Sequence, residues 1–112
     1  LIISGIDGGG IFIAQYGTRV AGMMNLQKIV STAAGGFSVL LEDLYVEPDM
    51  RGRGIGSMLI NHAVGWSKEE QAVRIQLGAD ARNAPALGFY QSKGFMRGNL
   101  VLHYKYISSV EL

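Results

Sequence analysis

The spacing of apolar and polar positions divides the first half of the chain into three expected strands. Residues 11–16 and 20–30 favour strands, and Gly17-Thr18-Arg19 between them predicts the turn of a hairpin. A second turn is expected at 33–36, which reads Ala-Ala-Gly-Gly, and residues 37–46 follow as the third strand. This half of the chain therefore predicts strands without a helix.

The second half alternates helices with strands. Apolar residues that recur at helical spacing predict a helix ending near 67–71: Ile55, Leu59, Ala63 and Trp66. A strand is expected at 73–77, and a last strand at 100–107. Between them, Pro85 suits the first turn of a short helix and Gly94 suits its C-terminal stop. The order βββαβαβ predicts a mixed α+β sheet with helices on its faces, in one domain covering 1–112.

Composition narrows the classes of function. The 112 residues are 48% hydrophobic and 17% charged with a formal net charge of +1, which is typical of one globular domain. The near-neutral charge gives no electrostatic footprint for nucleic acid or an anionic membrane, and no apolar run is long enough to span a bilayer. The chain has no cysteine, which is consistent with a cytoplasmic location and excludes an acyl-cysteine intermediate.

The richest chemistry lies where the third strand meets the first expected helix. This junction reads Arg51-Gly52-Arg53-Gly54-Ile55-Gly56-Ser57. The first backbone N–H groups of a helix have no intrahelical partner, and the helix dipole favours negative charge there. Glycines allow a phosphate to approach closely, and two guanidinium groups suit its oxygens. The sequence therefore predicts an anion site at the start of this helix.

Two common phosphate loops do not fit this junction. The nucleoside-triphosphate loop requires a Lys-Ser/Thr pair where Ser57-Met58 stands, and the dinucleotide fingerprint that begins at Gly52 requires glycine at Ser57. The order Arg51-x-x-Gly54-x-Gly56 instead resembles the acetyl-coenzyme A loop of the Gcn5-related N-acetyltransferase (GNAT) family. The resemblance implies that acetyl-CoA is the cosubstrate and that backbone amides hold its pyrophosphate.

A second segment carries the same resemblance. Residues 83–95 read Asn-Ala-Pro-Ala-Leu-Gly-Phe-Tyr-Gln-Ser-Lys-Gly-Phe, similar to the family's Asn-x-x-Ala followed by Tyr-x-x-x-Gly-Phe. The resemblance implies a GNAT-type sheet, mostly antiparallel and flanked by helices. It also implies that the family's N-terminal strand and two helices are missing, so that the chain opens on what would be the second strand. The uncovered sheet surface would favour a homodimer or a companion chain.

Glu42 and Asp43 are the candidate bases for removing a proton from an alkylammonium of pKa ~10.4. Glu42 is preferred, because an apolar strand would raise its pKa, and because Leu-Glu-Asp resembles the polyamine (diamine) acetyltransferase branch, in which the matching glutamate acts through water. Strand alternation would put Glu42 and Asp43 on opposite faces, so only one of them would face the site. A purely structural role for both, at the solvent or paired with arginine, stays open.

Tyr90 is the candidate general acid for the departing thiolate. Proton transfer from a phenol of pKa ~10 to a thiolate, whose conjugate thiol has a pKa of ~8.5, is unfavourable and would accompany cleavage of the C–S bond. Tyr90 would therefore speed the reaction without being indispensable. The alternative is an aromatic residue packed beside Phe89 and Phe95. His62 and His103 lack a ligand pattern around them, and structural roles are expected rather than a metal site. Trp66 and the Met23-Met24 pair are expected to pack in the core.

The resemblance also names the residues that bind the cosubstrate. The backbone of the third strand would hold the pantetheine arm like an added strand, with one amide facing the thioester oxygen. Asn83 would contact the arm or its phosphates, although an ordinary helix N-cap is compatible with this position. The expected binding residues are Leu44, Tyr45, Val46, Arg51, Gly52, Arg53, Gly54, Ile55, Gly56, Ser57, Asn83 and Ala86.

These features together predict an acetyl-CoA-dependent N-acetyltransferase. The acceptor would be a primary amine of a small molecule, acetylated by direct transfer within a ternary complex. One alternative is a GNAT-like module that binds coenzyme A but is catalytically weak and acts as a sensor or scaffold. Another is a nucleotide-phosphate binder, which competition with free nucleotide would reveal.

Overall fold

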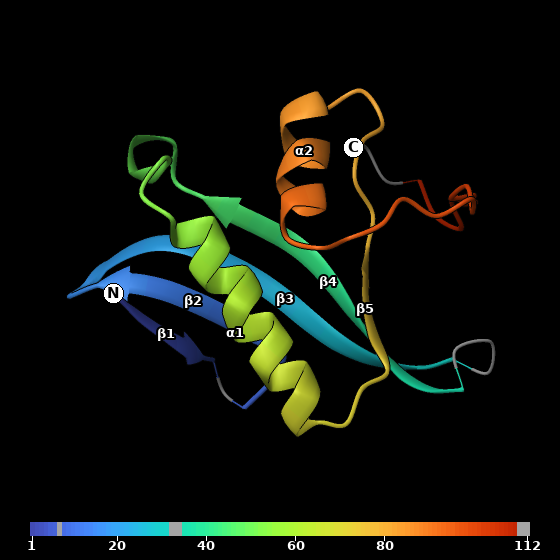
Figure 1. Ribbon diagram of the computed structural model, residues 1–112, viewed down its shortest axis with the longest axis horizontal. Coiled ribbons are helices and arrows are strands. Elements are labelled where there is room, and N and C mark those ends of the chain that lie inside the picture. Colours follow the sequence, from blue (N-terminus) through green and yellow to red (C-terminus); the bar gives the residue numbers. More distant parts are fainter. Residues whose placement is uncertain (7, 32–34, 110–112) are drawn as a thin grey trace.

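The computed structural model describes residues 1–6, 8–31 and 35–109, and in these ranges it contains a five-stranded sheet and two α-helices (Figure 1). The strands are β1 (Ile2–Gly5), β2 (Ile11–Tyr16), β3 (Arg19–Ser31), β4 (Gly36–Val46) and β5 (Arg74–Leu77). The helices are the short 3-10 helix η1 (Pro48–Met50), α1 (Ile55–Glu69) and α2 (Ala84–Ser92). The strands lie in chain order; the first three pairings are antiparallel and β4 pairs with β5 in parallel. The predicted mixed, mostly antiparallel α+β sheet is confirmed.

Strand β1 was not predicted. It pairs with β2 through Ile3 opposite Ala14, so the expectation that the chain opens on the second strand is wrong. Four residues are too short for a pattern of alternation to be visible in the sequence. Residues 6 and 8–10, which lead from β1 to β2, contain no helix. Of the predicted turn at 33–36, residues 33 and 34 lie outside the described ranges.

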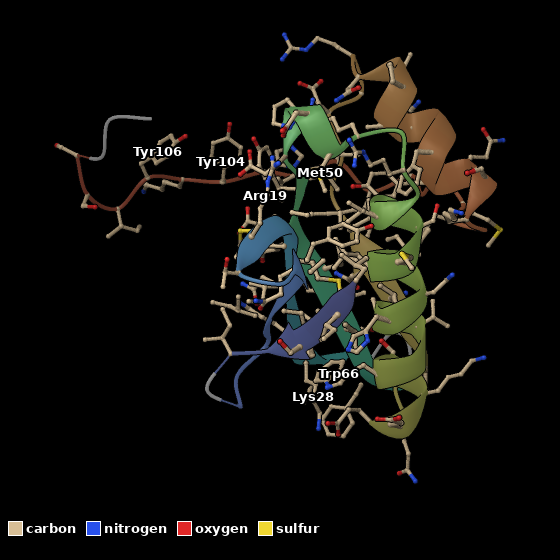
Figure 2. All side chains as sticks on the ribbon, turned by 90° about the vertical axis from the view of Figure 1, so that its left-hand side faces the viewer. Arg19, Lys28, Met50, Trp66, Tyr104 and Tyr106 are labelled. Carbon is tan, nitrogen blue, oxygen red and sulfur yellow. The ribbon has the colours of Figure 1, made fainter. Side chains whose placement is uncertain are left out.

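The core forms between the sheet and α1. Leu59 and Ala63 of α1 are fully buried, as are Met24 of β3 and Val39 of β4. Both α1 and α2 lie on the same side of the sheet in two perpendicular views (Figures 1 and 2), rather than one on each face. Gly22 of β3 allows α1 to approach, since a Cβ there would lie 3.2 Å from Leu59 Cδ1. The apolar spacing that predicted α1 therefore also identifies side chains that this helix buries against the sheet.

The predicted last strand at 100–107 does not form. Its residues have no strand partner among those the structure describes, and its large apolar side chains are 54% to 97% exposed. Figure 2 shows Tyr104 and Tyr106 well away from the sheet, on the side opposite α1. The β preference of a sequence depends on packing against neighbouring strands, and this segment pairs with no strand in the described ranges. No helix in the described ranges is long and apolar enough to cross a membrane.

Candidate functional site

The N-terminus of α1 presents a run of backbone N–H groups. Gly52 and Gly54 have φ angles of +77° and +81°, which bend the chain from η1 into the helix, and Gly54 is the N-cap. The first intrahelical hydrogen bond runs from Met58 N to Gly54 O at 3.0 Å. Within the described ranges, no acceptor is found for the N–H groups of residues 52–57. Unpaired N–H groups at a helix N-terminus are the backbone feature that the predicted anion site requires, and anion binding at this loop stays a prediction.

The two arginines of this loop differ in their surroundings. Arg51 Nε donates to Val46 O at 2.9 Å, and its guanidinium lies 5.7 Å from the centre of the Tyr45 ring. These contacts use one of the five guanidinium N–H donors and leave the terminal Nη groups to solvent or a ligand. Arg53 is exposed and makes no side-chain hydrogen bond or ion pair with a residue the structure describes. Arg51 therefore helps to hold the loop, whereas Arg53 is available as an auxiliary charge.

A salt bridge fixes the loop to the β2–β3 hairpin. Arg19 Nη2 donates to both carboxylate oxygens of Asp49 at 2.6 Å, and Figure 2 shows Arg19 near Met50 of η1. The hydrogen bond from Arg19 lowers the pKa of Asp49, and the same bond raises the pKa of Arg19. Glu47 N also donates to Ala21 O at 2.8 Å. The start of the loop is thus connected to the rigid part of the sheet.

Next to the loop, β4 and β5 separate and leave a cavity of about 520 Å³. The two strands pair only from Ser38 opposite Arg74 to Leu41 opposite Leu77, while β4 continues to Val46. The residues lining the cavity are Leu40, Leu41, Glu42, Asp43, Leu44, Leu77, Gly78, Tyr90 and Leu102. The structure therefore brings Glu42, Leu44 and Tyr90 together, as the predicted chemistry requires.

A β-bulge changes the expected facing of the two carboxylates. Glu42 pairs with Asn25 and Tyr45 with Met23, so that Asp43 and Leu44 lie opposite the single residue Met24. Asp43 has φ +56°, in the left-handed region. The bulge interrupts the alternation on which the expected opposite facing rests, and Glu42 and Asp43 are both among the residues that line the cavity. The Glu42 side chain is exposed, so the expected apolar burial is also absent.

Tyr90 lies half-buried among aromatic rings at the cavity. Its ring centroid is 5.5 Å from that of Phe89 and 5.9 Å from that of Phe95, both in edge-on geometry. Burial raises the pKa of the Tyr90 phenol above its ordinary value of 10.0. The phenol therefore remains protonated at neutral pH and can act as a proton donor. The packing of Tyr90 beside Phe89 and Phe95 is confirmed, and the acid role stays a prediction that this packing does not exclude.

Asn83 is the N-cap of α2. Its Oδ1 accepts a hydrogen bond from Ala86 N at 3.2 Å, while Pro85 occupies the first turn. The ordinary capping role of Asn83 is confirmed. The side-chain NH₂ group of this exposed residue is not used by the cap, which leaves a donor for a ligand.

Sequence reasoning missed three features of the site. Leu77 and Gly78 line the cavity because β5 diverges from β4, and Leu102 lines it although no strand forms there. Gly56 faces the Phe89 ring, since a Cβ at Gly56 would lie 3.3 Å from Phe89 Cζ. The two glycines at 54 and 56 indicated that another group approaches the backbone closely. They did not indicate that Gly54 forms the left-handed N-cap, whereas Gly56 lies beside the Phe89 ring.

The remaining candidates lie elsewhere. The His62 ring packs 5.1 Å from that of Phe12, and His103 is exposed on the C-terminal segment. No cluster of three metal-ligand side chains occurs in the ranges 1–6, 8–31 and 35–109. A second cavity of about 440 Å³ lies at the other end of α1, beside Trp66 and Lys28 (Figure 2), and contains none of the predicted site residues.

Comparison with known proteins gives a family match over most of the chain. The model of the acetyltransferase (GNAT) family matches residues 3–95. This range includes the loop, the bulge and α2.

Individual relatives and a solved structure agree with this match. A streptothricin acetyltransferase from Streptomyces lavendulae is 38% identical over 66 residues, which are 59% of this chain and 35% of that protein. A peptidyl-lysine N-acetyltransferase from Salmonella typhimurium is 36% identical over 55 residues, which are 49% of this chain and 34% of that protein. The match thus spans about a third of the length of these relatives.

Among solved structures, a predicted acetyltransferase with acetyl-CoA from Clostridium acetobutylicum has a TM-score of 0.71. It is 23% identical, over 85% of this chain and 62% of that chain. At this identity the likeness concerns the fold alone.

Proposed function

This chain belongs to the acetyltransferase (GNAT) family, and from that membership we propose that it transfers an acetyl group from acetyl-CoA to a primary amine of a small molecule. Acetyl-CoA would supply an activated acetyl thioester, with direct transfer within a ternary complex. The single observation that carries the proposal is that a carboxylate and a protonated phenol line one cavity on β4, the strand that leads into the unpartnered N–H groups at the start of α1.

The cosubstrate would bind along the loop and the free edge of β4. The N–H groups of residues 52–57 would donate hydrogen bonds to the pyrophosphate oxygens, and Arg51 and Arg53 would add positive charge beside them. Beyond Leu41, the β4 backbone has no β5 partner, so Leu44, Tyr45 and Val46 can pair with the amides of the pantetheine arm. Asn83 and Ala86, at the start of α2, would contact the same arm.

Glu42 and Tyr90 would move the protons. The Glu42 carboxylate accepts a proton from the acceptor ammonium, directly or through water, which frees the nitrogen lone pair to form the new C–N bond. The C–S bond breaks with its electron pair on sulfur, and the Tyr90 hydroxyl donates a proton to that thiolate. Because burial raises the pKa of Tyr90, this donation accompanies bond cleavage rather than driving it. The nitrogen of the new amide releases its second proton to solvent, from which Tyr90 regains its own.

The acceptor is proposed from the charges of the cavity. Glu42 and Asp43 both line it, which favours a cationic amine over an anionic acceptor. The Leu-Glu-Asp segment resembles the polyamine branch, whereas the relatives named for streptothricin and peptidyl-lysine acetylation show that acceptors in the family vary. We propose a small polyamine-like amine, and a cytoplasmic location on the ground of the cysteine-free sequence.

The test measures thiol release from acetyl-CoA with a panel of diamines, aminoglycosides and a lysine peptide. We expect turnover with the small cationic amines and a raised melting temperature with acetyl-CoA alone. The Tyr90→Phe variant serves as the matched control for enzymatic turnover. A melting shift without turnover on any amine would instead favour the coenzyme A-binding module, and no melting shift would contradict the proposed site.

A further inference from the structure

Gly56 and Phe89 form a direct contact between α2 and the segment of residues 51–57, which we call the anion loop. Gly56 is the second residue of α1, and its N–H belongs to the unpartnered cluster. An added Cβ would lie 3.3 Å from Phe89 Cζ and 3.8 Å from Cε1. The ring of Phe89 therefore occupies the space that a side chain at Gly56 would take.

Phe89 links this contact to Tyr90. The two rings lie edge-on at 5.5 Å, and Lys93 Nζ lies 5.7 Å from the Phe89 centroid. Helix α2 has no fully buried residue, so its position depends on a few half-buried side chains, of which Phe89 and Tyr90 are two. Close-packed groups transmit small displacements, because contact energy rises steeply on compression.

We infer that Phe89 is a positioning residue that couples the occupied anion loop to the orientation of the Tyr90 hydroxyl. A phosphate bound to the first-turn amides fixes the backbone at Gly56, and the ring resting on this backbone then fixes Tyr90. Phe89 acts through Tyr90 and does not itself touch the reacting atoms. This inference rests on the proposed function of the loop and of Tyr90.

Inorganic pyrophosphate separates this coupling from direct contact, because it can bind the loop amides but lacks a pantetheine arm that could reach Tyr90. In nuclear magnetic resonance spectra, we expect pyrophosphate to shift both the amide signals of residues 52–57 and the ring signal of Tyr90. The Tyr90 ring signal is identified by its absence from the spectrum of Tyr90→Phe. In Phe89→Leu, the amide shifts should persist and the Tyr90 shift should fall at least about threefold. Amide shifts in the wild type without a Tyr90 response would overturn the coupling while sparing the proposed site.

Kinetics provide a second test through a double-mutant cycle. The Cβ of Gly56→Ala would press against the Phe89 ring, and Phe89→Leu would remove the far end of that ring. Each substitution should lower the single-turnover rate by about tenfold to a hundredfold. The affinity for acetyl-CoA should change less than about threefold. The double variant should recover part of the rate, because the shorter side chain leaves room for the new Cβ. Gly65→Ala, a helix glycine with open space around it, is the matched control.

The outcomes distinguish the two hypotheses. Strictly additive losses in the cycle, or equal losses of affinity and rate, would overturn the positioning role. Loop amides that respond to neither pyrophosphate nor acetyl-CoA would contradict the proposed function, and the coupling with it.

Discussion

Glu42 and Tyr90 line the same cavity although one belongs to β4 and the other to α2, separated in the chain by α1 and β5. A carboxylate can accept and a phenol can donate the protons that move in amine acetylation. The opening between β4 and β5 is what allows both to face one space.

Glu42→Gln should lower turnover by about 10²-fold near neutral pH and recover partly at alkaline pH, where more of the amine is already neutral. Acetyl-CoA affinity should change little, because the loop is untouched. The pH–rate profile with a saturating diamine measures this. Asp43→Asn is the matched control, since Asp43 lines the same cavity; an equal effect of both substitutions would point to simple acceptor attraction.

Tyr90→Phe keeps the ring contacts and removes the hydroxyl. The single-turnover rate should fall toward the lower end of the ~10²–10⁴-fold range of general-acid effects, because a phenol of raised pKa is a weak acid toward a thiolate. The loss should shrink with an activated aryl thioester, whose thiolate needs less protonation. Wild-type rates with acetyl-CoA would return Tyr90 to a packing role only.

Burial of Tyr90 also makes stability depend on pH. The folded state holds the phenolic proton more tightly than the unfolded state, because the folded pKa is raised above 10.0. The contribution to stability is therefore fully present below about pH 10 and is lost as pH rises through the folded pKa. Urea unfolding between pH 9 and 11 should show a smaller decline for Tyr90→Phe than for the wild type, and parallel declines would refute this assignment.

Ser57→Pro tests whether backbone amides bind the cosubstrate. Proline in the first turn deletes one N–H that has no intrahelical partner, as Pro85 does in α2. Loss of one charge-assisted hydrogen bond should weaken acetyl-CoA binding about tenfold to a hundredfold. Ser57→Ala retains the N–H and should bind normally in calorimetry. Equal affinity of the two folded variants would exclude this amide from the site.

Two glycine substitutions should have opposite effects on stability. In Gly10→Ala, the new Cβ would overlap the backbone carbonyl oxygen of Leu26 and disrupt the loop between β1 and β2, destabilising by about 3 kcal/mol or more. Gly65→Ala, in open space on α1, should stabilise by about 1 kcal/mol. Denaturant midpoints measure both, and similar midpoints would contradict the close packing at Gly10.

The long elements could be predicted from the sequence because their patterns have a direct physical cause. Ile55, Leu59 and Ala63 recur at helical spacing, and these are the residues that α1 buries. The backbone of the loop at 51–57 was predictable for the same local reason, since its glycines and the helix start determine its course. The capping chemistry of Asn83 likewise predicted the start of α2.

The features that failed depend on partners distant in the chain. The bulge at Asp43 needs β3 as a neighbour, and neither its φ of +56° nor the shared facing of Glu42 follows from alternation. Residues 100–107 carry a strand pattern, but strands form only where another edge accepts their hydrogen bonds. Gly56 resembled a residue chosen for phosphate approach, whereas its contact with Phe89 comes from the packing of α2.

The early end of the β4–β5 pairing has a consequence for hydrogen exchange. Between Leu41 and Val46 the β4–β5 pairing has ended, so the β4 amides that do not face β3 have no β5 partner to slow their exchange with solvent. A pantetheine arm bound there would pair with these amides as β5 pairs with the earlier part of β4. Ligand binding would then act as the last step of folding for this edge, because the cosubstrate would protect amides that the protein leaves unpaired.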